Sequence, residues 1–391
     1  MTTGAVPPYL GPMDNILTRD AGLDRLGRFV PRMGRAYAGQ RNTDRGLDAE
    51  PTTSALSPYL RRRLLTEEEV IAASIHAHGP GAVERFVQEV VWRSYFKGYL
   101  ETRPGIWNDY RARVAEGHAR LERESGLRRT YEKAVSGQTG IDGFDDWARN
   151  LVETGWLHNH ARMWFASIWI FTLRLPWALG AEFFLAHLLD GDPASNTLSW
   201  RWVGGLHTRG KHYVARAENI RRYTDGRYDP QGLDEAPEAL DEREPAPAAK
   251  LPSADALPRG DIALLIHLDD LLPESLPLDG ACVVRVGGLV AHADGAVDRV
   301  RQADESAMAD ALNRASVYFG CKALPVAPGW AGEYQVVAPW APVGPSAEAL
   351  PPCLRIRRPW DERVWPHSTR GFFKVRAMIP DLLAASGMIV D

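Results

Sequence analysis

Six tryptophans lie within residues 155–202, a high density for a helical segment of a globular protein. They are Trp156, Trp164, Trp169, Trp177, Trp200 and Trp202. The isolated polar residues beside them are Asn159, Arg162, Asp190, Asp192 and Asn196. A carboxylate buried beside a cation stays ionised, so Asp190 and Arg162 would form a charged pair in aromatic surroundings. Because tryptophan seldom clusters so densely in a plain helical core, this segment is the first candidate for a functional site.

Two earlier motifs also carry side chains that could bind a ligand. Thr53-Ser-Ala-Leu-Ser57 offers hydroxyls and free amide groups at a helix start, where phosphate binds well. Taken alone, that motif is more often an ordinary Ser/Thr helix cap. Glu89 lies three residues before Trp92, so a helix would present a carboxylate and a stacking ring on one face. Taken alone, this tryptophan is equally well explained by core packing.

The elements that must position these residues are mostly helical up to residue 230. Thr66-Glu-Glu-Glu is typical of a helix start, and a second helix is predicted from about Ala82. We expect two buried helices at 145–173 and 177–189, because Pro176 would end the first of them. The candidate residues of the tryptophan-rich segment would then lie on these helices and on the loops that follow them.

The pattern changes after residue 230. Residues 231–258 are rich in Pro, Ala, Asp and Glu, which is typical of a solvated linker. Beyond them, strands alternate with helices and predict a small α/β domain. The expected strands are at 262–267, 281–286 and 334–338, and the expected helices near 303–316 and 371–386. The predicted fold class is therefore α + α/β, with a helical domain at 1–230, a linker at 231–258 and an α/β domain at 259–391.

Composition is that of an ordinary globular chain of 391 residues, with 45% hydrophobic and 25% charged residues. We find no membrane-spanning or secretory segment and expect a cytoplasmic monomer. Residues 1–230 hold 31 Lys and Arg against 27 Asp and Glu, whereas residues 231–391 hold 15 against 23. The first part is thus the better candidate to meet a polyanion. The three cysteines fit no zinc or redox spacing, and we expect no metal.

Taken in order, the motifs of residues 30–230 resemble the FAD-binding domain of the DNA photolyase and cryptochrome family. The resemblance implies FAD as the cofactor, with its phosphates at the 53–57 motif and at Arg93. It places Asp190, Asp192 and Arg162 near the flavin edge and lets Asn196 accept a hydrogen bond from flavin N5. The implied cofactor-binding residues are Tyr37, Thr53, Ser54, Ala55, Leu56, Ser57, Arg93, Asn159, Arg162, Asp190, Asp192 and Asn196.

The same resemblance implies a substrate pocket for a flipped cyclobutane pyrimidine dimer. Trp92 and Trp202 match the family tryptophans that stack on the dimer, and Glu89 matches the carboxylate that binds the thymine edge. Asn159 and Met163 complete the matched pocket. Relatives that act on 6-4 photoproducts carry histidines at the positions of Asn159 and Met163 and glutamine at the position of Glu89. This chain therefore resembles the cyclobutane-dimer type.

Electron transfer to the flavin in this family uses a chain of tryptophans, and Trp200 and Trp177 match its proximal and middle members. We find no tryptophan at the distal position, where Trp107, Trp164, Trp169 or a tyrosine could substitute. We also expect the α/β antenna domain that precedes the helical domain in typical members to be absent. The C-terminal α/β domain is either a relocated form of it or an unrelated replacement, and a second chromophore remains an open question.

The resemblance thus predicts a deoxyribodipyrimidine photolyase, a carbon-carbon lyase that repairs UV-damaged DNA by electron transfer from reduced FAD. Glu89, Trp177, Trp200 and Asn196 are its expected catalytic residues. The alternatives are a cryptochrome-like blue-light photoreceptor without repair activity and a flavin-binding scaffold without photochemistry. Basic residues at 61–63, 128–129 and 221–222 could line a DNA-facing rim, although charge runs are more often simply solvated.

Overall fold

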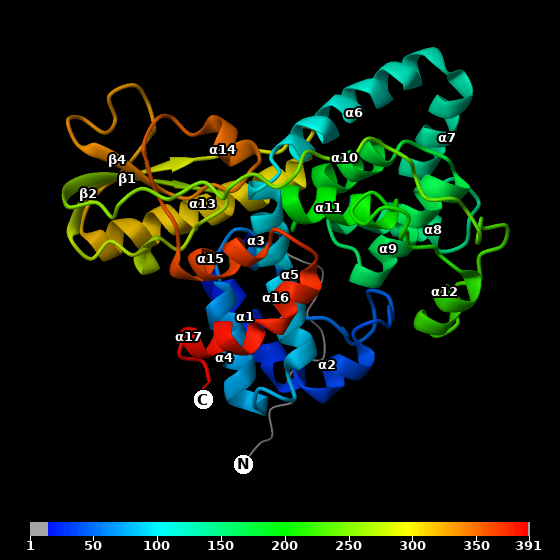
Figure 1. Ribbon diagram of the computed structural model, residues 1–391, viewed down its shortest axis with the longest axis horizontal. Helices are drawn as coiled ribbons and strands as arrows, with labels where there is room; N and C mark the ends of the chain where they lie inside the picture. Colours follow the sequence, from blue (N-terminus) through cyan, green and yellow to red (C-terminus); the bar gives the residue numbers. More distant parts are fainter. Residues whose placement is uncertain (1–14, 390–391) are drawn as a thin grey trace.

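The computed structural model describes residues 15–389. Residues 1–14, which the sequence analysis includes in the helical domain, and residues 390–391 lie outside the described part. Helices make up the first part of the chain, and a sheet with its own helices follows a long irregular segment (Figure 1). The structure thus confirms a mostly helical region followed by an α/β region.

The helical part is built from short and medium helices around the long central α5. They are α1 (Arg19–Phe29), α2 (Arg35–Gln40), α3 (Ser57–Arg61), α4 (Glu67–His78), α5 (Glu84–Glu101), α6 (Gly105–Arg123), α7 (Ser125–Val135), α8 (Phe144–Thr154), α9 (Asn159–Ser167), α10 (Trp177–His187), α11 (Pro193–Val203) and α12 (Ala217–Tyr223). A 3₁₀ turn spans Val30–Arg32, and a π-helical turn at Ile168–Thr172 extends α9.

Local sequence signals explain several helix boundaries. Thr66 caps α4 in a complete capping box with Glu69, as its sequence predicts. Helix α10 begins directly after Pro176, which is also as predicted. The single helix expected at 145–173 is wrong. Gly155 adopts the left-handed conformation, with φ of 69°, and ends α8, and His158 then caps a separate α9.

The C-terminal sheet is parallel throughout and has the strand order β3-β2-β1-β4-β5. Its strands are β1 (Gly260–His267), β2 (Ala281–Leu289), β3 (Ala323–Leu324), β4 (Gln335–Pro339) and β5 (Leu354–Ile356). The last six residues of β1 are all buried, as expected of a central parallel strand covered on both faces. Helix α13 (Asp298–Phe319) packs against β2. The three predicted strands correspond to β1, β2 and β4, whereas the short β3 and β5 were missed.

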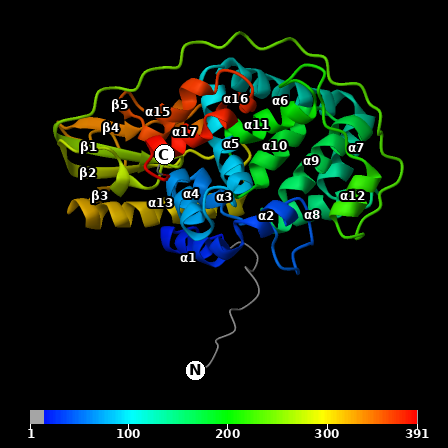
Figure 2. The ribbon, with the colours of Figure 1, turned by 60° about the horizontal axis from the view of Figure 1, so that its bottom comes forward.

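The connection between the two parts and the end of the chain both extend across the molecule. Residues 224–259, all of them described, contain no helix or strand, and Figure 2 shows them running along the outside from α12 to β1. The chain then returns from the sheet to α5. The elements of this last stretch are α14 (Pro345–Ala349), α15 (Pro359–Val364), a 3₁₀ turn (Trp365–His367), α16 (Phe372–Ala377) and α17 (Ile379–Ala385). Since α15, the 3₁₀ turn and α16 all contact α5, the C-terminal segment and the helical part share a core.

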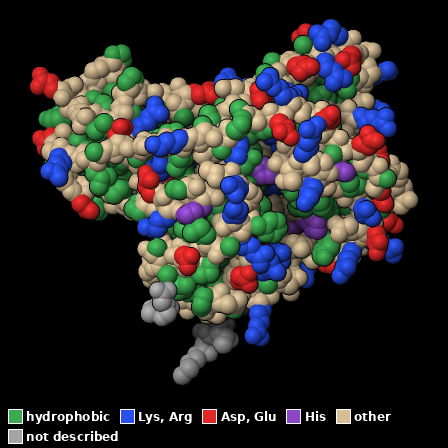
Figure 3. All heavy atoms as spheres, viewed as in Figure 1, with side chains coloured by type: hydrophobic (Ala, Val, Ile, Leu, Met, Phe, Trp, Pro, Cys, Tyr) green, Lys and Arg blue, Asp and Glu red, His purple; other side chains and the backbone are tan. Residues whose placement is uncertain are grey.

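The surface shows no dominant charged patch on the face drawn in Figure 3, where basic and acidic side chains are interspersed. Among the helices of residues 15–389, none combines the length and the apolar character that crossing a membrane requires.

Candidate functional site

The first part of the candidate site is the carboxylate of Asp190, which the structure places against Arg162 as predicted. Arg162 Nη2 donates to Asp190 Oδ2 over 3.0 Å, and Arg162 Nε donates to Leu157 O over 2.9 Å, so the guanidinium is held from two sides. The Ser57 hydroxyl also donates to this carboxylate. Burial by itself would raise the pKa of Asp190, but the Arg162 charge and these hydrogen bonds outweigh it and hold the pKa below its usual range. Asp190 is therefore ionised at neutral pH.

The second part is Asp192, which caps α11 and faces two cations of α5. Its Oδ1 accepts from Ser195 N over 2.7 Å, while its Oδ2 lies 3.5 Å from Lys97 Nζ and 3.7 Å from Arg93 Nη1. Burial would raise the pKa of Asp192, but the charges of Lys97 and Arg93 outweigh it, so the pKa is lowered. Lys97 was missed from the sequence. Its signal was the spacing of four residues from Arg93, which puts both cations on one helix face.

The Thr53–Ser57 motif leads into α3 beside this cluster. Ala55 has a φ of 50°, an unusual value for a residue other than glycine, which marks a tight turn before the helix. Arg93 Nη2 contacts Ser57 O at 3.5 Å, so the predicted phosphate residues lie together. Tyr37 is buried and packs edge-on against Phe86, with ring centroids 5.2 Å apart. Burial raises the pKa of this tyrosine, with a smaller contribution from nearby Glu89.

The side-chain amide of Asn196 is held by a hydrogen bond within the chain. It lies on the first turns of α11 and is 8% exposed. Its Nδ2 donates to Ala181 O over 2.7 Å, which leaves Oδ1 as the free acceptor of the amide. This orientation suits the predicted hydrogen bond from flavin N5.

The buried polar atoms around Asp190 and Asp192 fit an anionic cofactor that accepts and donates hydrogen bonds. Arg93 Nη1, Lys97 Nζ and Asp190 Oδ1 are buried and have no hydrogen-bond partner within the described chain. Buried polar groups are normally paired, and charged ones especially so. Two cationic donors suit a diphosphate and a carboxylate oxygen suits a ring N–H, so these residues fit FAD.

Three of the predicted substrate residues lie on α5 and α11 and are engaged with neighbours of their own chain. Glu89 lies 3.7 Å from Arg41 in a half-exposed ion pair, and burial raises its pKa despite that charge. Trp92 stacks on Phe372 of α16, with ring centroids 3.7 Å apart and planes 14° apart. Trp202, 36% exposed, stacks on Tyr213 at 5.6 Å. The contact with Phe372 was not foreseen, because nothing near α16 in the sequence indicates it.

The other two predicted substrate residues belong to α9. Asn159 is the first residue of that helix and is exposed, whereas Met163, one turn later, is half-buried. Their positions one turn apart agree with the helical spacing used in the sequence analysis.

The aromatic residues predicted to carry electrons form two groups. Trp200 is buried and lies 6.2 Å from Trp169 and 5.1 Å from Phe184 between ring centroids. Trp177 lies 6.1 Å from Tyr110, which lies 5.1 Å from Trp107. Of the substitutes considered for the distal position, Tyr110 is thus adjacent to the predicted middle member, and Trp107 lies one ring beyond it.

The suggestion that Arg61, Arg62 and Arg63 line a DNA-facing rim is wrong. All three are buried, at 7% exposed or less, and each is paired with carboxylates of the C-terminal region. Their partners are more than 200 positions away in the sequence, so a run of three arginines looked like a solvated surface segment. The arginine pairs at 128–129 and 221–222 are exposed.

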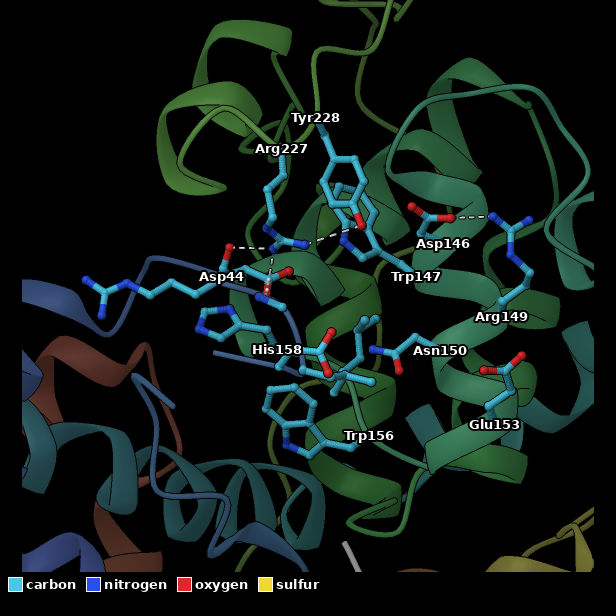
Figure 4. Close-up of a pocket in the computed structure, with 15 residues that line it drawn as sticks. Asp44, Asp146, Trp147, Arg149, Asn150, Glu153, Trp156, His158, Arg227 and Tyr228 are labelled. Atoms are coloured by element: carbon cyan, nitrogen blue, oxygen red, sulfur yellow. Dashed lines mark hydrogen bonds and ion pairs between the residues drawn. The ribbon is translucent and has the colours of Figure 1, made fainter. Parts of the chain in front are cut away.

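A cavity of about 350 Å³ opens beside the predicted site (Figure 4). Its lining comes from residues 44–48, from residues between 146 and 153 along α8, from 156–158 and from Arg227 and Tyr228, and includes Trp147 and Trp156. It meets the predicted site through His158, whose Nε2 lies 3.2 Å from Thr52 Oγ1, next to the Thr53–Ser57 motif. Burial lowers the pKa of His158 to about 4, so this ring is neutral at physiological pH.

The chain was compared with known proteins. Residues 86–233 match the model of the FAD-binding domain of DNA photolyase. The deoxyribodipyrimidine photo-lyase of Streptomyces griseus is 35% identical over 186 residues, which are 44% of this chain and 39% of that protein. That of Vibrio cholerae is 30% identical over 173 residues, 43% of this chain and 36% of that protein. The structure of a bacterial class III photolyase from Agrobacterium tumefaciens is 25% identical in sequence and superposes with a TM-score of 0.41. The matched part is 53% of this chain and 44% of that chain. The chain thus spans about two fifths of the length of the curated relatives it matches.

Proposed function

The chain belongs to the photolyase/cryptochrome family through its FAD-binding domain, and from this we propose that it is a light-dependent photolyase for cyclobutane pyrimidine dimers in DNA. The observation that carries the proposal is the buried cluster of Asp190, Asp192, Arg93 and Lys97. Its two cations are ion-paired with Asp192, but Arg93 Nη1, Lys97 Nζ and Asp190 Oδ1 have no hydrogen-bond partner in the described chain, and the hydroxyls of Thr53–Ser57 lie next to them. FAD, when bound there in reduced form, would supply under blue light the electron that opens the cyclobutane ring and would take it back afterwards.

The residues of the cluster would hold the cofactor and set the charge around it. Arg93, Lys97 and the 53–57 motif would bind the diphosphate through charge-assisted hydrogen bonds. Arg162 stays charged beside ionised Asp190, and both are fixed by the hydrogen bonds described above. Asn196 would offer its Oδ1 to the N5 edge of the ring. Because the cluster is buried, it would keep water away from the bound cofactor during electron transfer.

The substrate side of the site is proposed around Glu89, Trp92 and Trp202. A dimer must leave the duplex to be repaired, and this costs least at a damaged, poorly stacked pair. Trp202 offers an exposed face for stacking, and the half-exposed carboxylate of Glu89 can accept from a thymine N–H.

A second candidate function is a blue-light photoreceptor without repair activity. The observation in its favour is that Phe372 stacks on Trp92 and covers the ring that a dimer would need. In that case the flavin site would be unchanged, and the C-terminal segment would carry the signal.

A variant pair separates these functions. Glu89→Ala removes the proposed substrate contact, while Glu122→Ala, at an exposed carboxylate of α6, is the control. Both proteins are loaded with FAD, reduced chemically and illuminated with a dimer-containing oligonucleotide. We expect Glu89→Ala to lower the repair yield at least about tenfold with FAD still bound, and the control to behave as wild type. Equal repair by both variants would remove Glu89 from the site, and absence of repair in wild-type protein that binds FAD would favour the photoreceptor.

A further inference from the structure

We propose that Asp269 and Asp304 of the α/β region are positioning residues for the cofactor site, acting through Arg61 and Arg62 on the Asp190–Asp192 turn. The inference rests on the proposed FAD site and extends it, because it makes the C-terminal sheet a working part of that site. The α/β region would then hold the two flavin-facing carboxylates in place, in addition to any role of its own.

Arg61 bridges the carboxyl end of β1 and the turn. Its Nε donates to Gly191 O over 2.9 Å, while its Nη1 donates to Leu268 O over 2.9 Å and to Asp269 Oδ1 over 3.0 Å. The side chains of both ionic partners are less than 10% exposed. The guanidinium is therefore fixed between the two regions by its planar donor geometry.

Arg62 makes the equivalent bridge one residue further along. Its Nη1 donates to Leu189 O over 2.6 Å, and its Nε and Nη2 donate to Asp304 Oδ1 over 2.8 and 2.6 Å. Asp304 is held in turn by His292, whose Nδ1 lies 2.8 Å from Oδ2. The aspartate is thus oriented by a second contact within the α/β region.

The two bridges act on alternate groups of one short segment. The carbonyls of Leu189 and Gly191 face Arg62 and Arg61, whereas the side chains of Asp190 and Asp192 face Arg162, Arg93 and Lys97. Because the two arginines hold the carbonyls of Leu189 and Gly191, they also fix the directions in which the side chains of Asp190 and Asp192 point. The charge of Asp192 also acts on Arg61, and that of Asp190 acts on Arg62.

The third arginine of the run provides a matched control. Arg63 is equally buried and pairs with Asp361, at 2.6 Å, with Asp270 and with Glu67. Its hydrogen bonds and ion pairs in the described part of the chain are with the α/β region, α15 and α4, and none of them reaches the 189–192 segment. Asp361→Asn therefore disturbs the same interface and the same kind of ion pair without touching the turn.

The test compares FAD binding by the full-length variants Asp269→Asn, Asp304→Asn and Asp361→Asn, each assayed well below its own unfolding temperature. We expect the first two to weaken FAD binding about tenfold and to shift the absorption spectrum of the bound flavin, by analogy with outer-shell partners of metal ligands. Asp361→Asn should leave affinity and spectrum as in wild type. If an aspartate variant fails to fold, Arg62→Lys takes its place in the test. This variant keeps the charge near Asp304 but loses the planar guanidinium that also reaches Leu189, so it should weaken FAD binding in the same way.

Two results would overturn the proposal and can be told apart. If wild-type protein binds FAD and the Asp269, Asp304 and Arg62 variants bind it as well as Asp361→Asn does, the bridges do not position the site. If wild-type protein itself binds no FAD, the proposed function fails together with this inference.

Discussion

A buried carboxylate at the junction of the two regions makes the stability of the protein depend on pH. Glu101, the last residue of α5, is 5% exposed. Its Oε1 accepts from Val343 N over 2.7 Å and its Oε2 accepts from Trp340 Nε1 over 3.1 Å, both just after β4. Burial raises the pKa of Glu101 from 4.5 to about 7, although these hydrogen bonds partly oppose it. The folded protein therefore binds a proton at Glu101 more tightly than the unfolded chain does.

The sign and size of the effect follow from this difference. Stabilisation by the protonated carboxyl is complete below pH 4.5 and is lost as the pH rises to about 7, because the folded state must then bury a charge. Each unit of pKa difference corresponds to about 1.4 kcal/mol, so the contribution lost across this window is about 3 kcal/mol. Glu101→Gln removes the titration. Since the amide keeps only one acceptor oxygen, the variant also loses one of the two hydrogen bonds at every pH.

The assay is denaturant unfolding of wild-type protein and Glu101→Gln between pH 4.5 and 8. We expect the free energy of unfolding of wild type, relative to the variant, to fall by about 3 kcal/mol across this range. Glu122→Gln, which alters an exposed carboxylate on α6, is the control for general charge effects. Parallel curves for wild type and Glu101→Gln would show that Glu101 stays ionised in the folded protein and would refute the reasoning.

Three further predictions concern the photochemistry and the substrate side. Trp200→Phe should slow flavin photoreduction by an external donor at least about tenfold while sparing repair by chemically reduced protein, and an unchanged photoreduction rate in a transient absorption measurement would contradict its role. Tyr110→Phe, at the ring next to Trp177, should also slow photoreduction if electrons enter by that route, whereas an unaffected rate would exclude Tyr110. Phe372→Ala should tighten binding of dimer-containing DNA about two- to tenfold, since an aromatic pair contributes about 0.5–1.5 kcal/mol and its loss frees Trp92. Weaker binding in a fluorescence anisotropy titration would instead make Phe372 part of the DNA site.

Much of the candidate site could be predicted because its residues follow one another on neighbouring helices. The pairing of Asp190 with Arg162 was expected from the family resemblance, whereas the helix cap at Thr66 depends on local spacing that a single sequence displays. The break between α8 and α9 depends on Gly155 in a left-handed conformation, a signal that the strong apolar pattern on either side outweighed. Helix existence was thus easier to predict than helix ends.

The contacts between distant segments could not be predicted in the same way. Arg61 and Arg62 look like surface residues until Asp269 and Asp304 are brought to them by the fold. Nothing in the local sequence of Phe372 indicates that it meets Trp92, 280 positions earlier. These partners are selected by the packing of the sheet and the C-terminal helices on α5, which single-sequence patterns do not report.

The measurement that tests the account most directly is repair of a cyclobutane-dimer oligonucleotide by the purified, FAD-loaded protein after chemical reduction, under blue light and in the dark. The account predicts restored pyrimidines in the illuminated sample alone, in proportion to the bound FAD. Intact dimers in both samples, with FAD bound and reduced, would contradict it.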